Sequence, residues 1–501
     1  MPSAEVKELR KNGQLQEALA MALLDLEKEP ENIWTKRALS WVYYDLLKKH
    51  ADAHDFEDFT ETLEKVKELG MPADEIMFFE NLAWPLSNVF RFLAKQNTKD
   101  FAKISALYLL TKEFPIARPG KSFSVLYAAI HKAYKDFAQY TEVIDELGLE
   151  NLSPEDFEEE EFSGKKNMSL AEQVYIAYAK HLEEGEPVDS YGHRQVDTAK
   201  IQEFMPLLED LIEKHPNYVY PPYFKAKLLL KLGADDVMTS FLPFARKKKG
   251  DYWVWQLLAE IYRDQPEIVF AGYCKALSLG AKDEFLVKIR QKLAGLLIAE
   301  GKYAEAKAEI ENILNVKEKT GTRIPNEIQS WVNADWYKNV ESIRNNYTLY
   351  SQYAPEAEEL LFADLPEETV VVEFVNHDRK ILNFVKDQNK NGFFKYDRLL
   401  RDPQIGDVLK VRFRDNPNEG RYMVYTVKAG NPEECSALKE VNGDLRTIPS
   451  GSGFLGDVFV DKAIIAKFGL TSGQKIEGKA MLSFNKAKNK WGWKLIAPSK
   501  T

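Results

Sequence analysis

The spacing of apolar residues changes once along this chain, near residue 369, and that change limits what the chain can fold into. Up to about residue 315, apolar side chains recur at intervals of three and four, as at Leu15, Leu19 and Leu26, which is the period of an amphipathic helix. Beyond residue 369 they alternate, as at Val370 and Val372, which is the period of a half-buried strand. The chain is therefore predicted to be multidomain, with an all-α region followed by an all-β region.

The length supports this division. A chain of 501 residues exceeds what one hydrophobic core normally organises, so about three domains are expected. The predicted boundaries are 1–315 for a helical region, 316–368 for a helical extension and linker, 369–431 for a first small β domain, and 432–501 for a second.

A short motif repeats within the helical region. Gly13-Gln-Leu-Gln-Glu-Ala18 recurs as Gly301-Lys-Tyr-Ala-Glu-Ala306, and Pro30 follows the first copy by twelve residues. A glycine at a turn, a small alanine where helices cross, and a closing proline resemble the tetratricopeptide repeat, although the spacing between units is irregular. The resemblance implies a helical-repeat solenoid. Such a stack offers an extended concave surface that commonly binds protein, so a protein partner is expected there.

The two β domains follow one plan. Phe393-Phe394 corresponds to Phe459-Val460 at an offset of 66 residues, and Gly406 corresponds to Gly473 at 67. Five short strands in about 65 residues, separated by glycine-containing turns, match the size of an oligonucleotide-binding (OB) barrel. The sequence therefore predicts two small all-β OB-fold barrels in tandem.

Charge is distributed unevenly between the two regions. Residues 369–501 hold 23 Lys and Arg against 15 Asp and Glu, whereas the rest of the chain holds 45 against 63. A basic domain on an acidic body is typical of a protein with one polyanion-binding part, although a chance imbalance gives the same numbers. The polar start, the lack of a membrane-length apolar run and only two cysteines lead us to expect a cytoplasmic protein with no membrane contact.

Three stretches resemble ligand motifs without the context that each motif needs. Arg118-Pro-Gly-Lys-Ser122 ends like a phosphate-binding loop but follows a predicted helix instead of a strand. Asp387-Gln-Asn-Lys-Asn-Gly392 begins like a calcium loop but lies between predicted strands, so a hairpin turn with a positive φ at Asn-Gly is expected. His50 and His54 have helical ligand spacing but no third ligand is evident. We expect no metal, no cofactor and no catalytic site, and thus a protein that is not an enzyme.

Aromatic and basic residues cluster in the last domain. Alternation places Val458 and Val460 inside the barrel and Phe459 outside, near Phe454. Exposed rings beside cations are the usual composition of a groove for single-stranded nucleic acid, because rings stack on bases and ammonium groups contact phosphates. The alternative is that the rings cap the barrel end and that the tryptophans belong to the core. The basic hairpin and the strand after it supply Lys486, Lys488, Lys490, Trp491, Trp493 and Lys494.

These motifs resemble those of a known class. Gly-x-Gly-Phe454 followed by Asp-Val-Phe459-Val is similar to the RNA-binding signatures of cold-shock and S1-type OB domains. The resemblance implies base-stacking positions at Phe384 and Phe393 in the first domain and at Phe454 and Phe459 in the second. Lys395 and Asp461 stand where those domains usually have histidine, and Leu382 and Ser452 stand where they have another aromatic. These departures imply weaker binding or a different ligand.

The combination of domains resembles one bacterial family. A diverged helical repeat containing Asp251-Tyr-Trp-Val-Trp255, joined to tandem S1/cold-shock-like domains, is similar to the S1/CSD-like proteins of the TOTE conflict systems. That resemblance implies a non-enzymatic partner of nucleic-acid-processing proteins in defence against invading nucleic acid. We therefore predict an adaptor that binds single-stranded RNA or DNA through its OB domains and a protein through its solenoid. The alternative is a pure protein-interaction scaffold whose OB domains bind no nucleic acid.

Overall fold

The computed structural model divides the chain into two compact units, Met1–Lys249 and Gly250–Thr501, which are described separately. The residues described are 2–162, 164–189, 193–397, 399–414, 420–485 and 488–499. None of the helices within these ranges combines the length and the apolar composition that crossing a bilayer requires.

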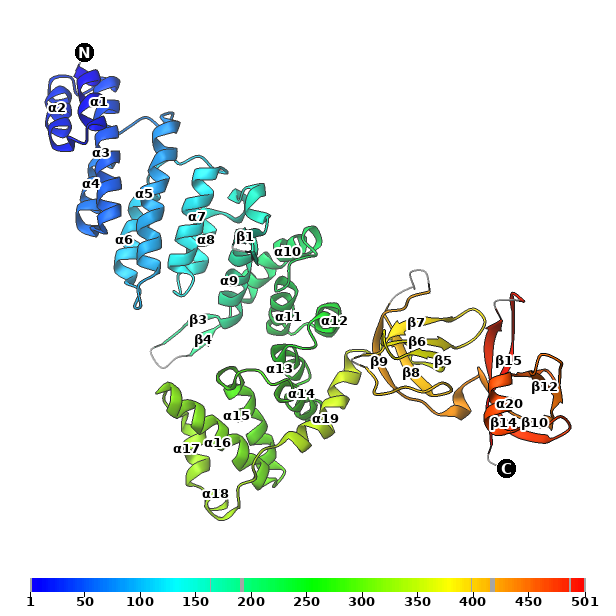
Figure 1. Cartoon of the computed structure of the whole chain (residues 1–501). Coiled ribbons are helices and arrows are strands. Elements are labelled where there is room, and N and C mark those ends of the chain that lie inside the picture. Colours follow the sequence, from blue (N-terminus) through cyan, green and yellow to red (C-terminus); the bar gives the residue numbers. More distant parts are fainter. Residues whose placement is uncertain are drawn as a thin grey trace. The chain divides into compact units, whose positions relative to one another are not determined.

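The first unit is built from helices that contact their neighbours along the chain (Figure 1). Two short hairpins, β1 (Glu160–Phe162) with β2 (Lys165–Asn167) and β3 (Glu186–Pro187) with β4 (Arg194–Gln195), interrupt the series. The helices are α1 (Pro2–Lys11), α2 (Leu15–Lys28), α3 (Ile33–Ala53), α4 (Phe56–Glu68), α5 (Ile76–Ala94), α6 (Phe101–Thr111), α7 (Lys121–Tyr134), α8 (Tyr140–Leu147), α9 (Leu170–Glu184), α10 (Thr198–Lys214), α11 (Pro221–Leu232) and α12 (Val237–Lys247).

The second unit begins with seven more helices and continues into two β domains. Helix α19 packs on α14, and α15 packs on α16. The helices are α13 (Tyr252–Ile261), α14 (Pro266–Ser278), α15 (Asp283–Ala299), α16 (Tyr303–Thr320), α17 (Asn326–Asn333), α18 (Asp335–Asn339) and α19 (Tyr347–Leu360). The fold class is the one expected: a helical region followed by small OB-like β domains.

The repeated glycine motif forms the same turn in both of its copies. Gly13 has φ 78° and donates its N–H to the Arg10 carbonyl at 3.0 Å, ending α1. Gly301 has φ 74° and donates to the Ile298 carbonyl at 3.1 Å, ending α15. These left-handed glycines satisfy carbonyls at the helix ends, as a C-terminal cap requires. The alanines five residues on are fully buried where the next helix packs. The turn thus explains the motif, whereas assignment to the tetratricopeptide family stays a prediction.

The first β domain, barrel 1, is a five-stranded sheet that curls toward closure. Its strands are β5 (Glu368–Asn376), β6 (Ile381–Val385), β7 (Asn391–Lys395), β8 (Val408–Phe413) and β9 (Val424–Ala429), in the order β7-β6-β5-β8-β9. A parallel bridge between Phe393 and Arg421 joins β7 to the segment before β9. This bridge brings the third strand beside the fifth, which is how an OB barrel closes.

The second β domain, barrel 2, has the same connections. Its elements are β10 (Leu438–Asp444), β11 (Arg446–Thr447), β12 (Gly453–Leu455), β13 (Val458–Val460), α20 (Lys462–Phe468), β14 (Lys475–Asn485) and β15 (Lys490–Pro498). The strand order is β10-β14-β15-β13-β12-β11, and β13 pairs with β15 in parallel. The core contains Leu445, Leu455, Val458, Val460 and Leu495.

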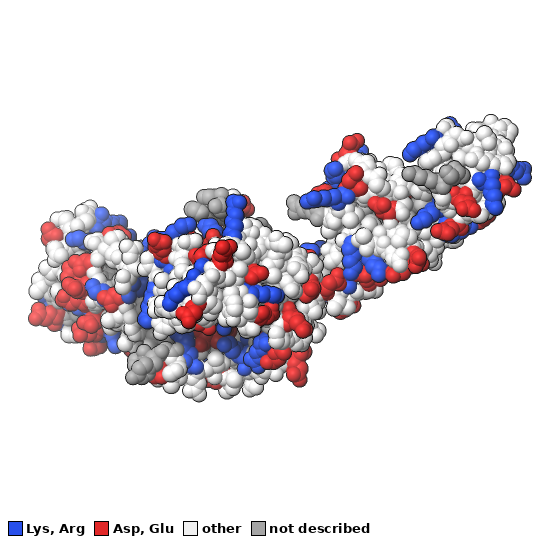
Figure 2. Space-filling view, turned by 90° about the horizontal axis from the view of Figure 1, so that it is seen from below, with Lys and Arg blue, Asp and Glu red and all other residues white. Residues whose placement is uncertain are grey.

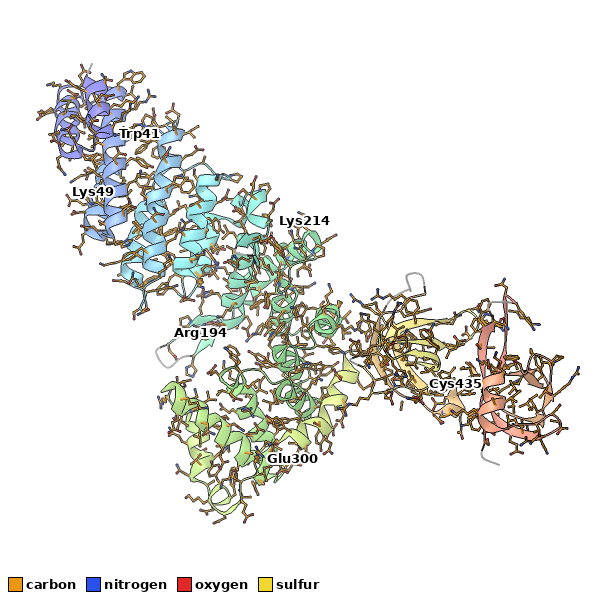
Figure 3. All side chains as sticks on the ribbon, in the orientation of Figure 1. Trp41, Lys49, Arg194, Lys214, Glu300 and Cys435 are labelled. Atoms are coloured by element: carbon orange, nitrogen blue, oxygen red, sulfur yellow. The ribbon has the colours of Figure 1, made fainter. Side chains whose placement is uncertain are left out.

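The two barrels contact each other through an apolar cluster. Val371, Val385 and Val408 of barrel 1 pack with Cys435, which lies between the two sheets (Figure 3), and with Met481 of barrel 2. At the edge of the cluster, the Ser483 hydroxyl donates a hydrogen bond of 2.6 Å to the Glu373 carboxylate. This contact buries residues that a solitary barrel would expose.

Two of the three ligand-like motifs have structural roles. Helix α6 precedes the Gly-Lys-Ser segment, where a phosphate-binding loop needs a strand, and α7 begins at Lys121. The Asp387 carboxylate accepts hydrogen bonds from the N–H groups of Asn389 and Lys390, forming the β6–β7 turn. The hairpin is confirmed, but the expected positive φ is wrong for Gly392. This glycine lies in β7, where the Tyr422 ring is 2.6 Å from the position a Cβ would take.

Candidate nucleic-acid interface

A row of outward-facing side chains crosses barrel 2 from strand to strand. Arg446 of β11 pairs with Phe454 of β12, and Phe454 pairs with Phe459 of β13. Phe459 in turn pairs with Lys494 of β15. Directly paired residues on neighbouring strands lie about 5 Å apart and point to the same face. We call these four residues row 2: a cation, two aromatic rings and a second cation side by side.

The two rings of row 2 are held by their neighbours along the strands. Leu455, Val458 and Val460 are buried, so the alternation turns Phe454 and Phe459 outward, as predicted. Both rings are half-buried, and they meet edge to face with centroids 5.6 Å apart and an interplanar angle of 66°. Packing against one another restricts the rings while leaving part of each exposed.

Barrel 1 carries a comparable row. Phe374 of β5 pairs with Asn383 of β6, which pairs with Phe393 of β7, and Phe393 bridges to Arg421. Phe374 is 53% exposed, Asn383 and Phe393 are half-buried, and Arg421 is exposed. We call these four residues row 1. The sequence analysis missed Phe374 and Arg421. Alternation along β5 places Phe374 on the buried face with Val372, and only the register shift between these two residues turns Phe374 outward.

The two rows correspond position by position. Each has a phenylalanine on the third strand, Phe393 or Phe459, beside a cation: Arg421, just before the fifth strand of barrel 1, or Lys494, on the fifth strand of barrel 2. The residue after each phenylalanine, Phe394 or Val460, is buried in its barrel. The 66-residue offset seen in the sequence therefore relates equivalent positions, and the arrangement of ring beside cation occurs in both domains.

Phe384 does not occupy the predicted base-stacking position. Its ring is fully buried in barrel 1, with its centroid 5.0 Å from those of Phe413 and Tyr422. Asn383 takes the outward place instead. Alternation could not show which side chains of β6 face outward, because Val385, which follows Phe384, is also buried, under the contact between the barrels. A strand covered on both faces shows no alternation.

Both tryptophans of β15 also differ from the prediction. Trp491 packs against the cluster between the barrels and lies 5.3 Å from Phe484, centroid to centroid. Trp493 packs against the core of barrel 2, and the Lys439 ammonium lies 4.4 Å from its ring centroid. The two indoles do share a strand face, but Lys494, which follows Trp493, faces the other way, toward row 2. The structure thus supports the alternative, in which these indoles contribute to packing.

Further cations surround the rows. Lys395 is exposed two residues beyond Phe393, and Lys488 and Lys490 are exposed at the β14–β15 hairpin. The loop between the fourth and fifth strands of an OB barrel commonly contributes to the ligand site. The predicted Lys486 lies outside the described residues. Figure 2 shows Lys and Arg side chains over the barrels with Asp and Glu among them.

Some cations of barrel 1 form ion pairs with carboxylates, and others are left for a ligand. Lys386 pairs with the Glu368 carboxylate at 2.8 Å, and Arg412 pairs with Glu359 of α19 at 2.6 Å. By contrast, among the described residues Lys395 and Arg421 make no ion pair. The cations near row 1 therefore remain available to an anionic ligand.

Asp461 has a local structural role. Its carboxylate accepts a hydrogen bond of 2.9 Å from the Ala463 N–H and so caps helix α20. It also lies 3.7 Å from the Lys494 ammonium. Aspartate is one of the favoured N-terminal caps of a helix. The residue that replaces the expected histidine thus starts the helix between the third and fourth strands, and it lowers the net charge near row 2.

The fold and the two rows define a class: a protein with tandem OB-type barrels whose outer faces combine rings with cations. Comparison with family models agrees. Residues 362–425 match S1/CSD-like domain 1 of the TOTE conflict systems, and residues 439–497 match S1/CSD-like domain 2 of the same systems. Residues 219–357 match a domain of unknown function, DUF7017. The comparison with curated proteins gives no match. The chain therefore carries the two S1/CSD-like domains of the TOTE type, preceded by a helical region with a DUF7017 domain.

Proposed function

We propose that this chain is a non-enzymatic adaptor whose two barrels bind single-stranded RNA or DNA along rows 1 and 2. One observation carries the proposal: in both barrels a phenylalanine on the third strand stands beside a cation that lies on the fifth strand or just before it. An aromatic ring can stack on a base while an adjacent ammonium or guanidinium group contacts the phosphate backbone. The match to S1/CSD-like domains supports the same function.

The chemistry favours single strands over duplexes. Stacking requires the face of a base, which a duplex keeps inside its own stack, and each stacked base contributes roughly 1–3 kcal/mol. Every base has such a face, so row 2, which holds rings and cations alone, should tolerate any sequence. Phosphate contacts release counterions, so binding should weaken as salt rises.

The helical region is proposed to bind a protein partner. Trp34, at the start of α3, is 64% exposed, and Met77, at the start of α5, is 68% exposed. Exposed large apolar side chains of this kind are enriched in protein–protein interfaces. A role in conflict with invading nucleic acid, alongside nucleic-acid-processing enzymes, belongs to this proposal through the resemblance to TOTE systems.

The direct test is binding of the full-length chain to fluorescein-labelled 20-nucleotide single strands and duplexes across a salt series. Phe459→Ala should weaken single-strand binding about 5- to 150-fold, the equivalent of one lost stack. Phe468→Ala is the matched control, because this phenylalanine of α20 is 44% exposed on the same barrel but lies outside row 2. It should leave affinity unchanged.

Binding that ignores both salt and Phe459→Ala would refute the proposal, and so would no binding at low salt. The second outcome, together with a purified complex containing a protein but no nucleic acid, would favour the scaffold alternative. A high absorbance ratio of 260 to 280 nm in the purified protein would count against that alternative.

A further inference from the structure

Rows 1 and 2 differ on the first strand, which carries Phe374 in row 1 and Arg446 in row 2, and on the second strand. Row 2 has Phe454 there, paired with Phe459, whereas row 1 has Asn383, paired with Phe393. Asn383 is also paired with Phe374 on its other side. An amide therefore stands between two aromatic residues in barrel 1, at the place where barrel 2 has a ring.

The Asn383 amide is partly exposed and is free to bind a ligand. Its side chain is half-buried, between the more exposed Phe374 and the half-buried Phe393. Within the described part of the chain, no hydrogen bond to this side chain is found, although other asparagines of the barrels have one. Asn376, for example, accepts from the Arg379 N–H at 3.0 Å. The Asn383 amide thus keeps one donor group and one acceptor for a ligand.

Adjacent strands are about 4.8 Å apart, so the amide lies within reach of a base stacked on either neighbouring ring. A carboxamide offers a donor and an acceptor side by side, and it pairs best with a base edge that offers the complement. Adenine has that pattern on both its Watson–Crick edge, N6–H with N1, and its Hoogsteen edge, N6–H with N7, whereas guanine, cytosine and uracil have it on the Watson–Crick edge but not on the Hoogsteen edge. Asparagine accordingly makes its preferred bidentate contact with adenine.

We propose that Asn383 reads the edge of a base held at row 1, with adenine preferred, so that barrel 1 selects a base while barrel 2 binds without selection. This inference rests on the proposed single-strand function. It assigns the two barrels different tasks: row 2 supplies sequence-tolerant affinity, and row 1 sets which segment of the strand is held.

The test uses the full-length chain and 12-nucleotide RNA and DNA repeats of the form UUUX (TTTX in DNA), with X as A, C or U (T in DNA). Spacing the adenines avoids the self-stacking of an adenine homopolymer. The chain should bind the A repeat about 5-fold or more tightly than the C and U repeats, the lower end of what a bidentate contact provides. Asn383→Ala should bring the three affinities within about twofold of each other.

Asn442→Ala is the control, since Asn442 lies on β10 of barrel 2, outside row 2, and bonds to Glu477 at 2.7 Å. It should keep the adenine preference. Equal binding of all three repeats by the unsubstituted chain, or an adenine preference that survives Asn383→Ala, would overturn the inference while the single-strand function stands. If a repeat with another base bound most tightly, the adenine assignment would be wrong. No binding to any repeat would instead reject the single-strand function itself, and the inference with it.

Discussion

Removing the charge of Glu309 should loosen the helices that lead into the barrels. The Glu309 carboxylate, on α16, is fully buried and accepts hydrogen bonds from Arg290 of α15 at 2.7 Å and from Asn346 at 2.6 Å. The Tyr350 hydroxyl of α19 also donates to it. Burial disfavours the Arg290 cation, yet the adjacent Glu309 charge raises the pKa of Arg290 overall. One carboxylate thus ties α15, α16 and α19 together.

Breaking a buried ion pair by removing one partner typically costs about 3–5 kcal/mol, because the other charge stays buried. For Glu309→Gln we expect the lower end, about 3 kcal/mol, because Arg290 keeps a contact of 2.9 Å with the largely exposed Asp283. Hydrogen exchange in peptides from α15, α16 and α19 should then be about 150-fold faster, since 1.4 kcal/mol corresponds to a factor of ten.

The control is Glu300→Gln. Glu300 pairs with Lys302 at 2.7 Å, but its side chain is about half exposed, and exposed pairs contribute only about 0–1 kcal/mol. A double-mutant cycle with Arg290→Met isolates the interaction, because the double variant should be less destabilised than the sum of the single variants. Strict additivity, or exchange in Glu309→Gln no faster than in Glu300→Gln, would refute the reasoning.

Two further predictions concern stability. Burial lowers the pKa of His131, which lies 2.7 Å from the Tyr140 hydroxyl, to about 3. The unfolded chain takes up this proton below about pH 6.5, so the free energy of unfolding should fall as pH drops from there toward 3, by about 2 kcal/mol at pH 5. Denaturation series at pH 7.5 and 5 should show this loss, and His131→Gln should remove it. An unchanged pH dependence in His131→Gln would contradict the assignment. Gly392→Ala should destabilise barrel 1 by about 1–3 kcal/mol because a Cβ would meet the Tyr422 ring. Gly443→Ala should destabilise barrel 2 less, because Gly443 has open space around it. The measurement is hydrogen exchange in barrel 1 of Gly392→Ala and in barrel 2 of Gly443→Ala, and an equal increase in the two variants would show that the clash relaxes freely.

Local pattern alone predicted much of the fold. The change from a period of three to four to a period of two predicted helices followed by strands, and the last helix before the barrels ends at Leu360 while the first barrel strand begins at Glu368. Alternation also predicted the outward position of Phe459, because Val458 and Val460 on either side of it are buried. These features depend on a few neighbouring residues, so the sequence carries them directly.

The composition of the candidate site was decided by contacts between distant segments. Arg421 lies beside Phe393, and Lys494 beside Phe459, only because the third strand pairs in parallel with the fifth strand or with the segment just before it. Trp491 packs away from row 2 because barrel 1 lies against that part of barrel 2. No periodicity in the chain encodes which non-neighbouring strands will meet.

Asn383, and not the predicted Phe384, faces outward on β6, and this difference also arises from contacts between distant segments. The register of β5 on β6 shifts between Val372 and Phe374, and the second barrel covers Val385, so β6 is buried on part of both faces. A one-residue change of register moves every side chain to the opposite face. The sequence by itself therefore determined the order of helices and strands and the phenylalanine of each third strand. Only the tertiary structure decided which cations and which amide stand beside those rings, because strand pairing and barrel packing are set by residues far apart in the chain.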